Sequence, residues 1–119
     1  MPVPVLGLDV GGVIVDRSGE ESDTSFFGDR PMDTPAVPGA FEAIAALTAG
    51  PFAGRVHVVS KAGPKIARLT REWFAHTDFF ARTGVPADNV RFVRHRHEKA
   101  PICDELGITH FVDDRLSVL

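Results

Sequence analysis

The sequence contains little of what would tie a protein to secretion, to a membrane or to nucleic acid. Its 119 residues include one cysteine, Cys103, so no internal disulfide can form, which fits a reducing compartment. No apolar run approaches the roughly 18 residues of a membrane-spanning helix, and the N-terminus lacks the basic start and long apolar stretch of a signal peptide. With a net charge of -3 and a pI near 5.9, specific nucleic-acid binding is not predicted. We therefore expect a cytoplasmic protein that contacts no membrane.

What the sequence does contain is a regular alternation of apolar strands and helices. Hydrophobic residues make up 44% of the chain, enough for one domain spanning residues 1–119. Apolar runs and periodicity predict strands at 3–8, 56–60, 89–93 and 108–112, and helices at 40–49, 64–77 and 98–106. The β-branched residues 13–15 read as a continuation of the first strand, and residues 78–88 have no clear assignment. The alternation predicts an α/β fold with a parallel sheet covered by helices.

The stretch from residue 16 to residue 38 differs from the rest. It is polar and rich in Asp, Ser, Gly and Pro, which predicts a loop or flap with little regular structure. Such a long loop inside a compact domain is uncommon unless it has a function.

Polar residues stand at the predicted strand ends. Asp9 follows the first strand, Ser60 ends the second, and Asp113 with Asp114 follows the fourth; Lys99 begins the helix after the third. In parallel sheets the ligand binds beyond the carboxyl ends of the strands, so we expect these side chains to meet at one edge.

These residue types suit phosphate chemistry. A dianionic phosphate ester repels a carboxylate nucleophile unless a hard cation, held by carboxylates, cancels the charge, and Mg²⁺ prefers such oxygen ligands. A lysine adds a second positive charge, and a hydroxyl with loop amides binds the remaining phosphate oxygens. An aspartate then forms an aspartyl-phosphate that water hydrolyses.

Four segments resemble the motifs of the haloacid dehalogenase superfamily, in the family's order. Residues 6–16, Leu-Gly-Leu-Asp-Val-Gly-Gly-Val-Ile-Val-Asp, resemble its first motif, and residues 56–60 its second, an apolar strand ending in Ser or Thr. Lys99 resembles the third-motif lysine, and residues 111–114, Phe-Val-Asp-Asp, are similar to the acidic fourth motif. From the first to the last they span nearly the whole length of the chain.

The resemblance implies a fold and a metal site. The fold would be a three-layer, Rossmann-like parallel sheet with strand order 3-2-1-4, in which 16–38 forms a flap in place of a full cap domain. Asp9 would be the nucleophile and a Mg²⁺ ligand, joined by the backbone carbonyl of Gly11 and by Asp114, with Asp113 close by.

The resemblance also implies how substrate is held. Ser60, Lys99 and Gly12 would bind the phosphate, and Lys99 would act in catalysis. An open site without a cap suits a small-molecule or macromolecular phosphate ester, or a site covered by a partner subunit in a homodimer. Family members normally continue with a further helix after the fourth motif, so a minimal form and a longer natural chain both remain open.

One position departs from the family pattern. Most phosphatases of the family carry a second aspartate, the general acid/base, where this chain has Gly11. Losing such a group typically costs about 100- to 10,000-fold in rate. The chain is therefore expected to be a magnesium-dependent hydrolase, a phosphatase working through an aspartyl-phosphate. The alternative is a non-catalytic domain that binds metal or phosphate ligands in a regulatory or structural role.

Other chemistries find less support. No Cys-x-x-Cys or His-Glu-x-x-His pattern accompanies the histidines, which disfavours zinc. Gly-x-Ser-x-Gly and Gly-x-Gly-x-x-Gly are both absent, which disfavours a serine hydrolase and a dinucleotide-binding fold. Dehalogenation needs no metal, so the acidic pair Asp113 and Asp114 argues against it. Arg91, Arg94 and Arg96 are read as a solvated face, and Cys103 as part of a helix core.

Overall fold

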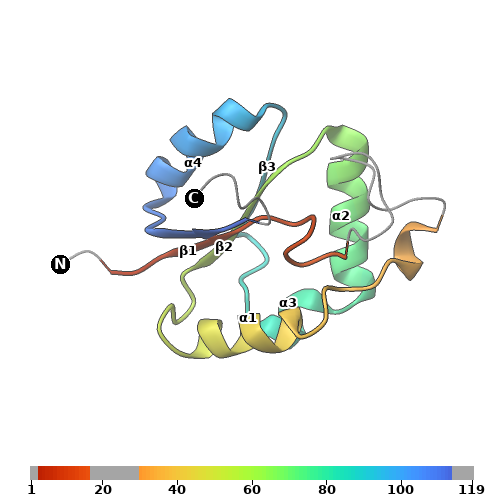
Figure 1. The fold of residues 1–119 in the computed structure, drawn as a ribbon, viewed down its shortest axis with the longest axis horizontal. Coiled ribbons are helices and arrows are strands. Elements are labelled where there is room, and N and C mark those ends of the chain that lie inside the picture. The colour runs from red at the N-terminus through yellow and green to blue at the C-terminus, as the bar shows by residue number, and fades with distance from the viewer. Residues whose placement is uncertain (1–2, 17–29, 114–119) are drawn as a thin grey trace.

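A four-stranded parallel sheet organises the fold (Figure 1). The computed structural model describes residues 3–16 and 30–113. Within them the strands lie in the order β3-β2-β1-β4, as predicted, and every pairing is parallel. Their bounds are β1 Leu6–Leu8, β2 Val56–Lys61, β3 Val90–Val93 and β4 His110–Val112.

The helices match the predicted positions closely. The bounds are η1 Pro31–Asp33, α1 Ala40–Ala49, α2 Pro64–His76, α3 Phe79–Thr83, η2 Arg96–Glu98 and α4 Lys99–Leu106. Helix α1 begins after Gly39 and ends at Gly50, and α4 ends at Gly107, whose φ of 72° is the left-handed conformation that glycine adopts easily. Helix α3 fills part of the stretch that had no assignment.

The main core lies between one face of the sheet and helices α1, α2 and α3. Residues in parallel register share a face, so Leu8 and its neighbours Val58 and Val112 point the same way. Trp73 is fully buried, and its ring packs edge-on against the Phe41 ring with the two ring centroids 5.9 Å apart. The cluster consists of Leu6, Leu8, Val10, Ile14, Val15, Phe41, Ile44, Phe52, Val56, Val58, Trp73, Phe74, Phe79, Val85 and Val90.

Helix α4 covers the other face of the sheet, which gives three layers. In Figure 1 it lies on the side of the strands opposite α1. Its first residue, Lys99, lies over the Phe111 ring of β4, and Glu105 pairs with Arg91 of β3 at 3.4 Å. No side chain of α4 is fully buried, so this second layer is thinner than the first.

Candidate functional site

The carboxyl ends of the strands bring three of the predicted residues together. Asp9 directly follows β1, Asp113 directly follows β4, and Lys99 is the first residue of α4. Strands β1 and β4 are neighbours with Leu8 beside Val112, so the two aspartates that come next leave the sheet side by side. The Asp9 backbone N–H donates to the Val112 carbonyl at 3.1 Å, which extends the ladder to the edge of the site.

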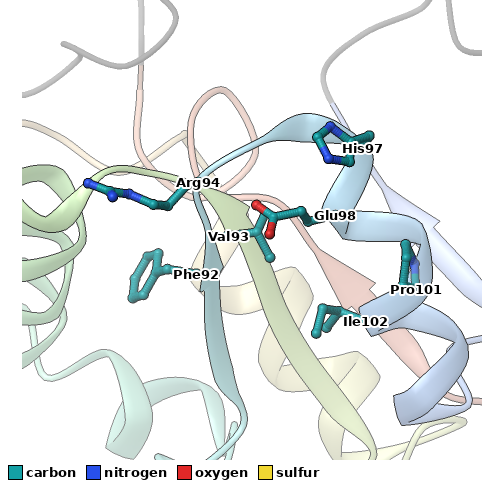
Figure 2. Close-up of a pocket in the computed structure, with 7 residues that line it drawn as sticks. All are labelled: Phe92, Val93, Arg94, His97, Glu98, Pro101 and Ile102. Carbon is teal, nitrogen blue, oxygen red and sulfur yellow. The ribbon is translucent and has the colours of Figure 1, made fainter.

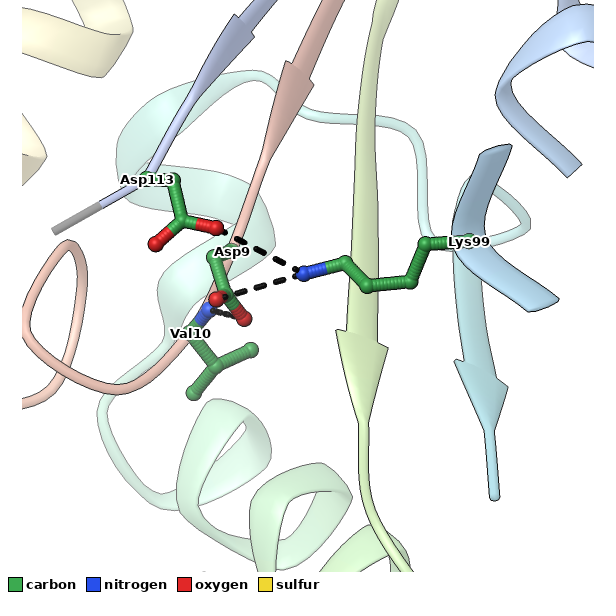
Figure 3. A network of polar contacts seen from close by, with 4 residues as sticks. All are labelled: Asp9, Val10, Lys99 and Asp113. Atoms are coloured by element: carbon green, nitrogen blue, oxygen red, sulfur yellow. Dashed lines mark hydrogen bonds and ion pairs between the residues drawn. The ribbon is translucent and has the colours of Figure 1, made fainter. Parts of the chain in front are cut away.

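Lys99 joins the two acids (Figure 3). Its Nζ lies 3.3 Å from Oδ2 of Asp9 and 3.9 Å from Oδ2 of Asp113. The side chain of Lys99 is 13% exposed, that of Asp9 is 18% exposed and that of Asp113 is 17% exposed, so the three charges are partly shielded from water. The ammonium of Lys99 therefore faces both carboxylates at the carboxyl end of the sheet.

The loop that follows Asp9 is tightly closed by its own backbone. The Val10 carbonyl accepts N–H groups from Val13, Ile14 and Val15 at 3.2, 2.8 and 3.0 Å. Gly12 turns the chain with a φ of 79°, where a side chain would be strained. The predicted continuation of the first strand through residues 13–15 is therefore wrong, because three β-branched residues are bent back onto one acceptor. The start of this loop also orients the Asp9 side chain, because Asp9 Oδ1 accepts the Val10 backbone N–H at 2.8 Å.

Two backbone groups in that loop were predicted to bind ligands. The Gly11 carbonyl accepts no backbone hydrogen bond within residues 3–16 and 30–113, and Gly11 itself is buried. The Gly12 N–H donates to the Val15 carbonyl at 2.8 Å. Phosphate binding by Gly12 would thus require that bond to open.

Ser60 lies inside β2, which runs one residue further to Lys61. It is 4% exposed, and in the described parts of the chain its hydroxyl forms no bond with Asp9, Lys99 or Asp113. Ser60 is thus at the expected edge of the sheet, one strand from Asp9, but outside the ion-pair network of Figure 3.

The residues that are described contain part of the expected metal site. Among them no three His, Cys, Asp or Glu side chains gather closely enough to hold a metal ion. Asp9 and Asp113 supply two carboxylates at this edge of the sheet, and carboxylate oxygens are hard donors of the kind that Mg²⁺ prefers. Asp114, predicted as the principal fourth-motif ligand, lies outside the described residues.

The long polar stretch is closed at its base. The Asp16 N–H donates to the Pro35 carbonyl at 2.9 Å, and the Val37 N–H donates to the Ile14 carbonyl at 2.8 Å. The segment that leads back to α1 has a further contact with the core, because Trp73 Nε1 donates to the Thr34 carbonyl at 2.8 Å. Residues 17–29, the middle of the predicted flap, lie outside the described residues.

Phe111 is a feature of the site that the sequence reading missed. Lys99 Nζ lies 4.9 Å from the centre of its ring, a cation–π distance. The ring also lies against Gly7, where an added Cβ would come within 2.6 Å of Phe111 Cδ2. Glycine at position 7 thus leaves room for the Phe111 ring beneath Lys99. In the sequence, the only sign of this contact is a residue without a side chain inside an apolar strand.

Two nearby titratable groups have shifted pKa values. Burial, with a smaller contribution from the Arg91 charge, lowers the pKa of His57 on the α4 side of the sheet. Burial also raises the pKa of the Cys103 thiol in α4. A raised pKa disfavours the thiolate, but Cys103 is only half-buried, in a helix without buried residues, so its predicted place in a core is not observed.

Comparison of the chain with protein-family models, with curated proteins and with solved structures finds no match. Among the residues that are described, no helix has the length and apolar character needed to cross a membrane. Functional inference therefore depends on the site geometry and on the motif resemblance.

Proposed function

We propose that the protein is a magnesium-dependent phosphatase of the haloacid dehalogenase type, with Asp9 as its nucleophile. The observation that carries the proposal is the convergence of Asp9, Asp113 and Lys99, from three separate elements, on one edge of the sheet. In open α/β sheets, ligands bind beyond the carboxyl ends of the strands, which is where these two partly buried acids and the lysine lie.

Each described group has a part in the reaction. Mg²⁺, held by Asp9, Asp113 and the Gly11 carbonyl, would supply the charge that lets a carboxylate approach a phosphate dianion. Lys99 orients Asp9 and binds a phosphate oxygen. An Asp9 oxygen attacks phosphorus, the ester P–O bond breaks, and the leaving oxygen takes a proton from water. A second water then attacks phosphorus, loses a proton to solvent and frees the Asp9 carboxylate.

Gly11 gives this mechanism a recognisable signature. With no acid side chain at that position, the leaving group departs without protonation by the residue that the family normally uses. Aryl phosphates, whose phenolate leaves readily, should therefore be turned over far faster than alkyl phosphates. We include in this proposal that residues 16–38 form a flap in place of a cap domain. The hydrogen bond from the Asp16 N–H to the Pro35 carbonyl, which joins the two ends of this stretch, supports it.

The experiment is phosphate release from phenyl phosphate with and without Mg²⁺. We expect metal-dependent turnover that falls at least about 1,000-fold in Asp9→Asn, because the nucleophile is lost. Lys65→Gln on α2, an exposed lysine, is the matched control and should keep its rate. Acid-quenched protein should carry phosphate on Asp9 in the wild type and in Lys65→Gln, but no phosphate in Asp9→Asn. Absence of turnover across aryl phosphates would refute the proposal.

The second candidate is a non-catalytic domain that binds metal or phosphate ligands. Gly11 favours it, because the site lacks the usual proton donor while keeping its acids and Lys99. Calorimetry that detects Mg²⁺ and phosphate binding, in protein that hydrolyses no ester, would select this alternative.

A further inference from the structure

A pocket opens at β3, the edge strand of the sheet, beneath the start of α4 (Figure 2). Its volume is about 480 Å³, within the range of small-molecule sites. It is lined by Phe92, Val93, Arg94, His97, Glu98, Pro101 and Ile102. In Figure 2, Ile102 and Pro101 lie on one side, Phe92 and Arg94 on the other, and Val93 and Glu98 between them.

The pocket and the phosphate site share one segment of chain. Glu98 lines the pocket, and the next residue, Lys99, reaches Asp9. The pocket wall and the lysine that contacts Asp9 therefore belong to one short segment of chain. Nothing in the earlier assignment of Asp9, Ser60 and Lys99 uses this space.

The chemistry of the lining is apolar with a basic rim. Val93, Pro101 and Ile102 present carbon surface, and Phe92 adds a ring at the outer edge. Arg94 is exposed and forms no ion pair within residues 3–16 and 30–113, unlike Arg91, which is paired with Glu105. An unpaired guanidinium beside an apolar wall matches an anion carried on an apolar body.

The acid in the pocket is already engaged. A Glu98 carboxylate oxygen accepts the His95 backbone N–H at 2.8 Å, which caps η2. The ring of His97 stacks on that of His95, with centroids 5.6 Å apart and planes within 6°, so the rim beside Glu98 has a defined shape. Glu98 keeps its negative charge while one of its oxygens caps η2, and Arg94 supplies a positive charge at the rim.

We propose that this pocket binds the leaving group of the substrate, and that the preferred substrates are phosphate esters of an aromatic or similarly apolar group bearing a second anion. This inference rests on the proposed phosphate site and adds a substrate class to it. Arg94 binds the second anion, while Val93 and Ile102 contact the apolar part of the leaving group. An aromatic leaving group also suits a site with Gly11, because it needs no general acid.

The test measures binding without turnover, with two phosphonates that cannot be hydrolysed. Benzylphosphonate and 4-carboxybenzylphosphonate are titrated calorimetrically into the full chain with Mg²⁺. We expect the carboxylated compound to bind about fivefold more tightly, since one partly exposed charge pair is gained. In Arg94→Gln the preference should fall to about one, whereas Arg91→Gln, the same change outside the pocket, should retain it.

Methyl NMR locates the ligand independently of affinity. Signals of Val93 and Ile102 should shift with the carboxylated compound. Equal affinities in the wild type, a preference that survives Arg94→Gln or is lost in Arg91→Gln, or failure of both compounds to bind would overturn the inference. Turnover of phenyl phosphate, which has no second anion, judges the proposed function separately.

Discussion

Replacing Lys99 by glutamine tests whether this lysine balances the two acids of the site. The ammonium lies 3.3 Å from Asp9 and 3.9 Å from Asp113, and its side chain is 13% exposed. Coulomb's law at an effective dielectric constant of about 20 gives an attraction of about 5 kcal/mol at the shorter distance. Desolvation of the partners offsets much of this, so we expect Lys99→Gln to lower the free energy of unfolding by about 2 kcal/mol in EDTA.

The assay is urea unfolding followed by circular dichroism, with EDTA and with Mg²⁺. If the acids form a metal site, Mg²⁺ replaces the missing charge and the deficit of Lys99→Gln should shrink below about 1 kcal/mol. Lys65→Gln is the control, since that lysine is exposed on α2; it should stay within about 0.5 kcal/mol of the wild type in both buffers.

Two results would refute the reasoning. A Lys99→Gln protein as stable as the wild type in EDTA would mean that the acids at positions 9 and 113 do not depend on the ammonium. A deficit that Mg²⁺ leaves unchanged would mean that they do not form a cation site.

Three further predictions concern the surroundings of the site. Gly7→Ala should lower the free energy of unfolding by about 2 kcal/mol in a urea titration, because its Cβ would come within 2.6 Å of the Phe111 ring. Trp73→Phe should cost about 2 kcal/mol by circular dichroism, because it removes the 2.8 Å bond to the Thr34 carbonyl and leaves a cavity in the main core. The lowered pKa of His57 favours its neutral form in the folded protein, so the unfolded chain binds the proton more readily. Stability should therefore fall as the pH drops through 6.5 toward the lower folded value, and less so in His57→Gln.

Each of these predictions has an outcome that contradicts it. A Gly7→Ala protein of wild-type stability would mean that Phe111 moves aside freely. Retention of full stability in Trp73→Phe would show that the hydrogen bond to Thr34 contributes nothing. Parallel pH curves for the wild type and His57→Gln would remove His57 as the source of the acid sensitivity.

The sequence predicted the strand order and most element positions because local signals and burial agreed. Glycines at 39, 50 and 107 mark helix ends, residues 56–60 form an apolar run that identifies a buried strand, and residues 89–93 alternate apolar and polar as an edge strand does. Asp9, Asp113 and Lys99 were also expected at one edge, since parallel strands carry their carboxyl ends to the same side.

The errors came where tertiary contacts override local preference. Residues 13–15 are β-branched and favour a strand, yet the backbone N–H of each one donates to the Val10 carbonyl, so the segment forms a turn. Helix α3 has five residues and starts at Asp78 in a left-handed conformation, a start that no capping pattern announces. The helix is held by Phe79, whose ring stacks on Phe74 at 4.2 Å. The pocket at β3 depends on how α4 lies over the sheet, which no local pattern contains.

The closed base of the long polar stretch has a consequence for the evolution of the site. Hydrogen bonds from Asp16 to Pro35 and from Val37 to Ile14 hold the two ends of the excursion against the body of the fold. Because the ends are fixed, inserting or exchanging residues between them leaves Asp9 in place, and doubling the length of a flexible loop costs only about 0.6 kcal/mol. The segment is therefore a place where the sequence can change in length or composition without moving Asp9.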